Sequence, residues 1–109
     1  MIVDQRTYAV RPGYLQQFVD TFAARGLPLY TSYCGTLLGY FTSESGTLNQ
    51  VVHLWGYADA ADRDARRAAL ARDPGWQAFL DVALPLLVSQ ESRLLKPTAF
   101  SPEFALPVG

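Results

Sequence analysis

The chain has a single histidine, His53, which lies two residues before Trp55 in the run QVVHLWGY. In a β-strand these two side chains would share one face. An imidazole with a pKa near neutrality can take a proton from an acidic phenol or enol, and an indole can stack on an aromatic substrate. His53 is therefore a candidate catalytic base. The alternative is that His53 is a buried polar group whose hydrogen bonds are satisfied inside the sheet.

Arg6 and Tyr8 form a second candidate pair, on one face of the run IVDQRTYAV at residues 2–10. Arg6 would anchor an anionic group, and Tyr8 would contact the substrate. If the two runs are adjacent strands with matching faces, Arg6 and Tyr8 meet His53. The alternative is an interface network in which Arg6 pairs with Asp4 across a dimer.

Metal chemistry and cysteine chemistry have little support. One histidine and one cysteine, Cys34, give no recognisable spacing of metal ligands. Cys34 has no activating neighbour in the sequence, so a buried, small, apolar role suits it better. We expect no metal and no cofactor.

The first half of the chain alternates strand and helix patterns. Residues 2–10 predict a strand, which Arg11-Pro12-Gly13 ends. Residues 12–25 predict a helix with Pro12 in its first turn and Gly26 just after its end. Residues 26–35 fit either a short helix or a structured loop, which could close a pocket between sheet and helices.

The second half begins with a predicted hairpin of strands 36–43 and 50–57. A helix over 59–72 follows, and its arginines are expected on a solvated face: Arg63, Arg66, Arg67 and Arg72. Asp73 and Pro74 are the typical start of another helix, which Pro85 should bend or end. The last strand covers 88–95, before a tail at 98–109.

The predicted element order is βαββαβ, the ferredoxin-like arrangement of one four-stranded antiparallel sheet with helices on one face. The length of 109 residues fits a single domain, residues 1–109 including the tail. An aromatic-rich opposite face needs a partner, and a second copy of the same sheet is the simplest one. We therefore expect a homodimer.

Composition limits the classes of partner. The net charge is −1 and the helix arginines are interleaved with aspartates, which argues against binding nucleic acid. Apolar runs are far shorter than the roughly 20 residues of a membrane span, and the first residues lack a signal-peptide pattern. We expect a cytoplasmic location and no membrane partner.

Residues 35–80 closely resemble the NIPSNAP family. The family pattern joins a Gly-Tyr-Phe strand, a turn, a V-x-H-L-W-x-Y strand, an arginine-rich helix and D-P-x-W. The matching residues are Gly39-Tyr40-Phe41, Gly46, Leu48-Asn49, Val51 to Tyr57, Arg63 to Arg72 and Asp73 to Trp76. The stretches RTYAVRPG at 6–13 and SRLLKPTAFSP at 92–102 extend the likeness over nearly the whole chain. The resemblance implies a dimeric α+β barrel, but no settled activity.

Two hypotheses on function follow. In the first, the protein binds a small organic molecule between sheet and helices, as a cofactor-free enzyme of monooxygenase or isomerase type. His53 and Arg6 would be catalytic, and Tyr8, Tyr40 and Trp55 would contact the substrate. In the second, the protein is a non-catalytic interaction domain, and the same residues hold a dimer together.

Overall fold

The computed structural model describes residues 1–108. Its strands are β1 (Ile2–Val10), β2 (Thr36–Thr42), β3 (Gln50–Tyr57) and β4 (Leu87–Leu95). Its helices are α1 (Leu15–Thr21), the π-helix η1 (Phe22–Gly26), α2 (Leu27–Tyr33), α3 (Ala60–Ala71), α4 (Pro74–Ala83) and the 3-10 helix η2 (Leu84–Leu86).

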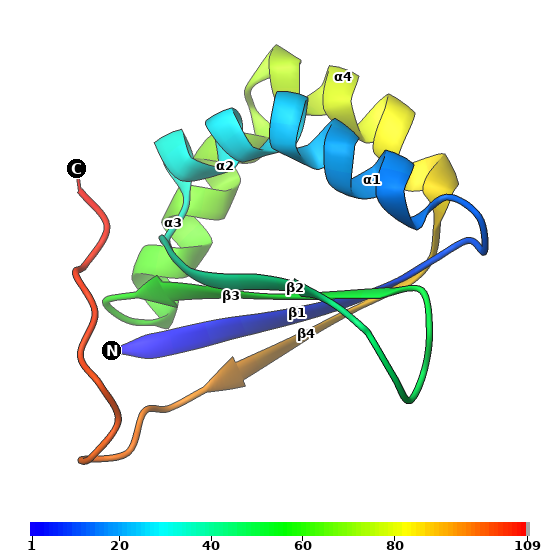
Figure 1. Ribbon diagram of the computed structural model, residues 1–109. Coiled ribbons are helices and arrows are strands. Elements are labelled where there is room, and N and C mark those ends of the chain that lie inside the picture. Colours follow the sequence, from blue (N-terminus) through cyan, green and yellow to red (C-terminus); the bar gives the residue numbers. More distant parts are fainter. Residues whose placement is uncertain (109) are drawn as a thin grey trace.

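The strands form one antiparallel sheet in the order β2-β3-β1-β4. All the long helices lie on one side of this sheet (Figure 1). The predicted ferredoxin-like α+β fold is therefore confirmed. β1 and β3 are the two central strands, as that topology requires.

The helix-covered face of the sheet carries the residues expected to do chemistry. The register places Arg6 opposite His53, and Tyr8 opposite Val51. Asp4 and His53 are fully buried, and only 7% of Arg6 is exposed. The alternation of side chains along each strand therefore predicts correctly that Arg6 and Tyr8 share a face with His53. The helices pack on that face and bury it.

The helical arm after β1 differs from the prediction. Pro12 lies in the turn before α1, not in its first turn, and the arm does not stop at Gly26 but continues through η1 into α2. Gly26 has an ordinary helical φ of −85°. It is needed for space: a Cβ there would lie 2.7 Å from Cδ2 of Phe22 and 2.9 Å from Cζ of Phe79.

The helix that the sequence starts at Asp73 and Pro74 begins there, and α3 begins one residue after the predicted position 59. Asp59 caps α3, and Asp73 caps α4 by accepting a hydrogen bond from the Gly75 amide at 2.7 Å. The other Asp73 oxygen accepts from the Tyr33 hydroxyl at 2.7 Å, which fixes α2 to the start of α4. Pro85 lies in η2, just after the end of α4.

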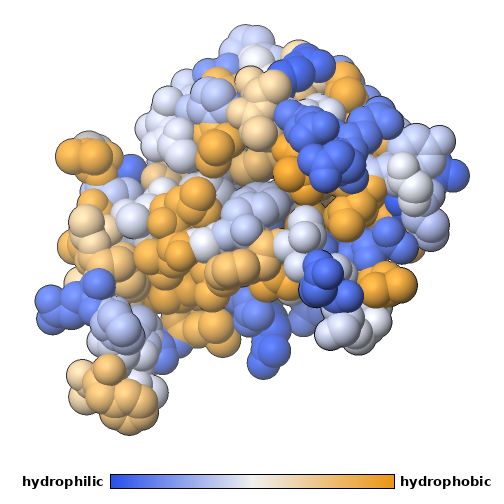
Figure 2. Space-filling view, viewed as in Figure 1, coloured by the Kyte–Doolittle hydropathy of each residue, from blue (hydrophilic) through white to orange (hydrophobic). Residues whose placement is uncertain are grey.

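Within residues 1–108, no helix covers the opposite face of the sheet, here called the open face (Figure 1). The register puts Thr7, Val52 and Leu54 near its centre. Figure 2 shows hydrophobic side chains gathered over the sheet and the tail, below the helices. The tail packs along one end of the sheet, where the Thr36 hydroxyl donates to the Ala105 carbonyl at 2.6 Å.

Membrane insertion was not expected from the sequence. Within residues 1–108, no helix combines the length and the apolar character that crossing a bilayer requires.

Candidate functional site

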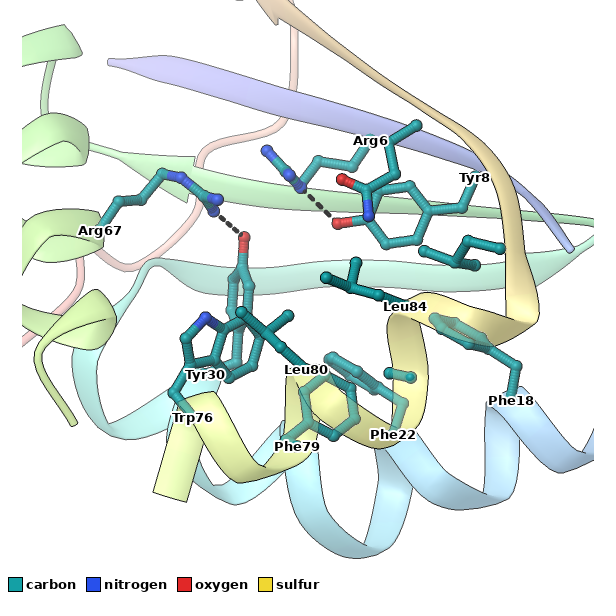
Figure 3. A pocket seen from close by; sticks show the side chains of 13 residues that line it. Arg6, Tyr8, Phe18, Phe22, Tyr30, Arg67, Trp76, Phe79, Leu80 and Leu84 are labelled. Atoms are coloured by element: carbon teal, nitrogen blue, oxygen red, sulfur yellow. Dashed lines mark hydrogen bonds between the residues drawn. The ribbon is translucent and has the colours of Figure 1, made fainter. Parts of the chain in front are cut away.

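A cavity of about 250 Å³ lies between the sheet and the helices (Figure 3). β1, the helical arm, α3, α4 and β4 all contribute to its wall. The lining residues are Arg6, Tyr8, Phe18, Phe22, Tyr30, Arg67, Trp76, Phe79, Leu80, Ala83, Leu84, Leu87 and Gln90. The volume is slightly below the roughly 300–1,000 Å³ of pockets for drug-sized ligands, so the cavity suits a smaller molecule.

Two arginine–tyrosine pairs make up what we call the polar end of the cavity: Arg6 with Tyr8, and Arg67 with Tyr30. Nε of Arg6 donates to the Tyr8 hydroxyl at 2.8 Å, and Nη1 of Arg67 donates to the Tyr30 hydroxyl at 2.7 Å. Figure 3 shows these four polar groups lying close together above the rings of α4. Each phenol oxygen is already an acceptor, so its own proton is free to point at a ligand.

The rest of the cavity is almost entirely apolar. Trp76, Phe79, Leu80 and Leu84 come from α4 and η2. Trp76 stacks on Phe79 with ring centroids 5.0 Å apart. Among the residues described, no aspartate or glutamate lines the cavity. The site therefore combines a basic, donor-rich end with an apolar body.

A buried carboxylate holds Arg6 in place. Asp4 accepts hydrogen bonds from Ser92 at 2.6 Å, Arg63 at 2.9 Å and Arg6 at 3.3 Å. Burial alone would raise the pKa of Asp4, but these hydrogen bonds and the two positive charges outweigh it and lower the pKa. The pairing of Arg6 with Asp4, which the sequence left open as a contact across a dimer, is made inside one chain.

The charges at the polar end persist near neutral pH. Burial opposes the charge of Arg6, but the Tyr8, Tyr30 and Asp4 oxygens around it outweigh that effect and raise its pKa. Burial also raises the pKa of Tyr30, although the charge of Arg67 opposes this change. Arg6 therefore stays cationic and Tyr30 keeps its proton, a combination that favours an anion.

His53 lies behind the cavity wall and does not line the cavity. Its ring packs edge-on against Tyr8, with centroids 4.8 Å apart, and Nδ1 accepts a hydrogen bond from the Trp55 indole at 2.7 Å. Burial, and then the charge of Arg6, lower the pKa of His53 to about 3. The imidazole is therefore neutral with its proton on Nε2, and its role as a base stays a prediction that this geometry does not favour.

Trp55 and Tyr40, two of the three predicted substrate contacts, also lie behind the cavity wall, beside His53. Trp55 is fully buried and packs on Tyr30 with centroids 4.3 Å apart, while Tyr40 stacks on His53 at 4.5 Å. Neither lines the cavity. Arg6 and Tyr8 do line the cavity. The five predicted site residues therefore lie together, with two in the cavity wall and three directly behind it.

Arg67 does not lie on the solvated helix face that the sequence predicts for it. Arg67 instead reaches the cavity, while Arg63 binds Asp4 and Arg66 pairs with Asp62 at 2.7 Å. The signal was present: Arg67 precedes the buried Leu70 by three positions, so both lie on one side of the helix. Tyr30, in the segment left undecided, proves to be a lining residue.

Metal ligation and thiol chemistry receive no positive support. Within residues 1–108, no three side chains of His, Cys, Asp or Glu are grouped so that they could hold a metal ion. Cys34 is 2% exposed, and burial raises the pKa of its thiol. A buried thiol of this kind is a poor nucleophile.

Fold and site together define a ferredoxin-like α+β domain with a small, basic and apolar cavity beneath its helices. The NIPSNAP family model matches residues 3–102, and the chain belongs to that family.

Curated relatives agree with this assignment. The NipSnap protein of Drosophila melanogaster is 33% identical over 101 residues, which cover 93% of this chain and 36% of that protein. NipSnap homolog 2 of Homo sapiens is 32% identical over 101 residues, or 93% of this chain and 35% of that protein. The chain thus spans about a third of the length of these curated relatives.

Solved structures extend the comparison to the fold. A NIPSNAP domain protein from Burkholderia xenovorans is 44% identical with a TM-score of 0.90, covering 94% of this chain and all of the other. A Nitrosomonas europaea protein assigned to the antibiotic biosynthesis monooxygenases is 11% identical with a TM-score of 0.67, covering 89% and 98% of the two chains. At that identity the second likeness concerns the fold alone.

Proposed function

We propose that this protein binds a small organic anion in the cavity between sheet and helices. The observation that carries the proposal is the polar end, where Arg6–Tyr8 and Arg67–Tyr30 place positive charge and phenol protons in an otherwise apolar space. An anionic head group would accept hydrogen bonds from these four side chains. An apolar body would lie against α4, so aromatic or short aliphatic carboxylates fit best.

Binding is supported more directly than catalysis. A cofactor-free monooxygenase or an isomerase must first remove a proton from its substrate, and a general base must lie within hydrogen-bond reach of that proton. Among the residues described, the cavity wall has neither a carboxylate nor an imidazole. An enzymatic role would therefore suit a substrate that enters already ionised, such as an enolate or phenolate held by the two arginine–tyrosine pairs.

The experiment compares matched acids and amides. Benzoate, phenylacetate and hexanoate should raise the melting temperature of the protein, whereas benzamide and hexanamide should not. A ligand at 100 times its Kd adds ~2.7 kcal/mol to the free energy of unfolding. Equal shifts from an acid and its amide would contradict recognition of a negative charge.

A matched pair of arginine variants locates the binding. Arg67→Met removes a charge from the polar end but keeps an apolar stem, so the shift caused by benzoate should largely disappear. Arg72→Met removes a charge from the exposed end of the same helix and should leave the shift intact. A similar loss in both variants would mean that benzoate binds by general charge attraction.

We also propose that the protein is a homodimer joined through the open face. Phe41, which is 57% exposed, and the partly exposed Val52 and Leu54 give this face an apolar surface, and such surfaces commonly pair with a second sheet. The resemblance to the family points the same way. A purely structural dimer is the alternative function, and it predicts no response to the acids above.

A further inference from the structure

Two buried polar atoms lie just behind the cavity wall: Nε2 of His53 and the hydroxyl oxygen of Tyr40. Both are shielded from solvent, and within residues 1–108 neither has a hydrogen-bond partner. The two rings stack with centroids 4.5 Å apart, so the two atoms belong to side chains in direct contact. Because an unpaired buried polar group is unfavourable, such a pair calls for an occupant.

The existing hydrogen bonds determine what kind of group these two atoms could bind. Nδ1 of His53 accepts a hydrogen bond from the Trp55 indole N–H at 2.7 Å, so the imidazole proton is on Nε2, which can only donate. The Tyr40 hydroxyl can donate or accept. A donor beside a hydroxyl group suits an oxygen atom, either a hydroxyl or a carbonyl.

Phe22 separates this region from the cavity. Its ring lines the cavity, stacks on Tyr40 at 5.0 Å and lies 6.1 Å from the ring of His53. Tyr8, which also lines the cavity, packs on His53 at 4.8 Å. Phe22 is the lining ring that stacks on Tyr40, so it would have to move for a ligand in the cavity to reach the Tyr40 hydroxyl.

The backbone at Phe22 is irregular, and its ring packs closely on Gly26. Phe22 begins the π-helical turn that ends at Gly26, and π-helical turns occur often at functional sites. A Cβ on Gly26 would lie 2.7 Å from Cδ2 of Phe22, so only glycine leaves this ring its present space.

We propose that His53 and Tyr40 form a second, deeper subsite that takes an oxygen substituent of the ligand when Phe22 swings aside. This inference rests on the proposed function, since the head group of the same ligand occupies the polar end. The ligand class is then an aromatic carboxylate with a second oxygen on its ring.

The test compares benzoate with 2-, 3- and 4-hydroxybenzoate by isothermal titration calorimetry. At least one hydroxybenzoate should bind wild-type protein about five- to tenfold more tightly than benzoate, the gain expected of one net hydrogen bond. In Tyr40→Phe this preference should shrink to less than about twofold. Tyr14→Phe, which changes an exposed tyrosine, should retain it. Tyr40→Phe removes only an unpaired hydroxyl, so its folding should be preserved.

The outcomes separate the two proposals. If all four acids bind equally, the subsite is refuted while the proposed function stands. If none binds, both are refuted. A preference that survives Tyr40→Phe also refutes the subsite. A crystal structure of the complex should show the ring oxygen about 3 Å from Nε2 of His53, with Phe22 displaced. An unmoved Phe22 in that structure overturns the inference.

Discussion

At the residue scale, burial determines the chemistry of His53. The side chain is fully buried and close to the charge of Arg6, and both effects favour the neutral imidazole. One nitrogen is already occupied by Trp55. His53 is therefore better suited to hold Trp55 and Tyr8 in position than to exchange protons with a substrate.

The buried imidazole predicts a specific pH dependence of stability. The pKa of His53 is about 3 in the folded protein and about 6.5 when unfolded. Between these values the unfolded chain binds one more proton, so stability is complete above pH 6.5 and falls as the pH decreases below it. The free energy of unfolding should drop by about 1.4 kcal/mol per pH unit between pH 6 and 5.

Urea unfolding at several pH values checks this expectation. Because His53 is the only histidine, its imidazole resonance can also be followed by NMR without an assignment problem. The resonance should not titrate between pH 7 and 4.5. A midpoint near 6.5 would show that the ring is accessible and would restore it as a candidate base.

At the element scale, the helical arm from α1 through η1 to α2 shapes the cavity. It contributes Phe18, Phe22 and Tyr30 to the wall, and Gly26 lets it approach α4 closely. The hydrogen bond from Tyr33 to Asp73 then fixes the end of the arm to the start of α4. Wall residues thus depend on contacts between elements that are far apart in the chain.

Gly26→Ala should destabilise the protein although alanine is the better helix former. The helix gains about 1 kcal/mol from the exchange, but the new methyl group overlaps the rings of Phe22 and Phe79. Overpacking of this kind costs about 1–3 kcal/mol or more, so we expect a net loss of unfolding free energy in urea.

The reverse substitution at a neighbouring exposed position is the control. Ala24→Gly changes helix propensity without touching the core and should cost only about 1 kcal/mol. If Gly26→Ala were more stable than wild type, the helical arm would have to shift enough to accommodate the new methyl group. Close packing against Phe22 and Phe79 would then not explain the glycine at position 26.

At the scale of the whole molecule, the two faces of the sheet have different proposed roles, ligand binding and dimer formation. Its helix-covered face carries the cavity and the buried charges, while its open face is apolar near the centre and, within residues 1–108, free of helices (Figure 1). We expect the open face to join two copies, which leaves each cavity within its own chain.

Val52→Arg should convert the proposed dimer to a monomer. Val52 faces the open side between β1 and β2, opposite Thr7 and Phe41, so an arginine there would bury an unpaired charge in a sheet-to-sheet contact. Sedimentation velocity reports the change in mass. Val82→Arg, on the outer side of α4 and 40% exposed, should leave the wild-type mass unchanged. A wild-type monomer, or a dimer that survives Val52→Arg, would exclude this interface.

Local patterns in the sequence were sufficient for the elements and for the grouping of residues. Alternation puts Arg6 with Tyr8, and His53 with Trp55, on common strand faces, and Asp73 with Pro74 marks the start of α4. These features depend on neighbours a few positions away, so they can be read from one chain. Helix propensity and capping act over the same short range.

Only the tertiary structure decided which side of the sheet the helices cover and what remains open beneath them. Alternation with a period of two is identical for a face turned inward and a face turned outward. The cavity is the space left after five separate elements pack, so no local pattern could place Arg67 in its wall or His53 behind it. Long-range packing likewise made Gly26 a spacer within a continuous helical arm and not its end.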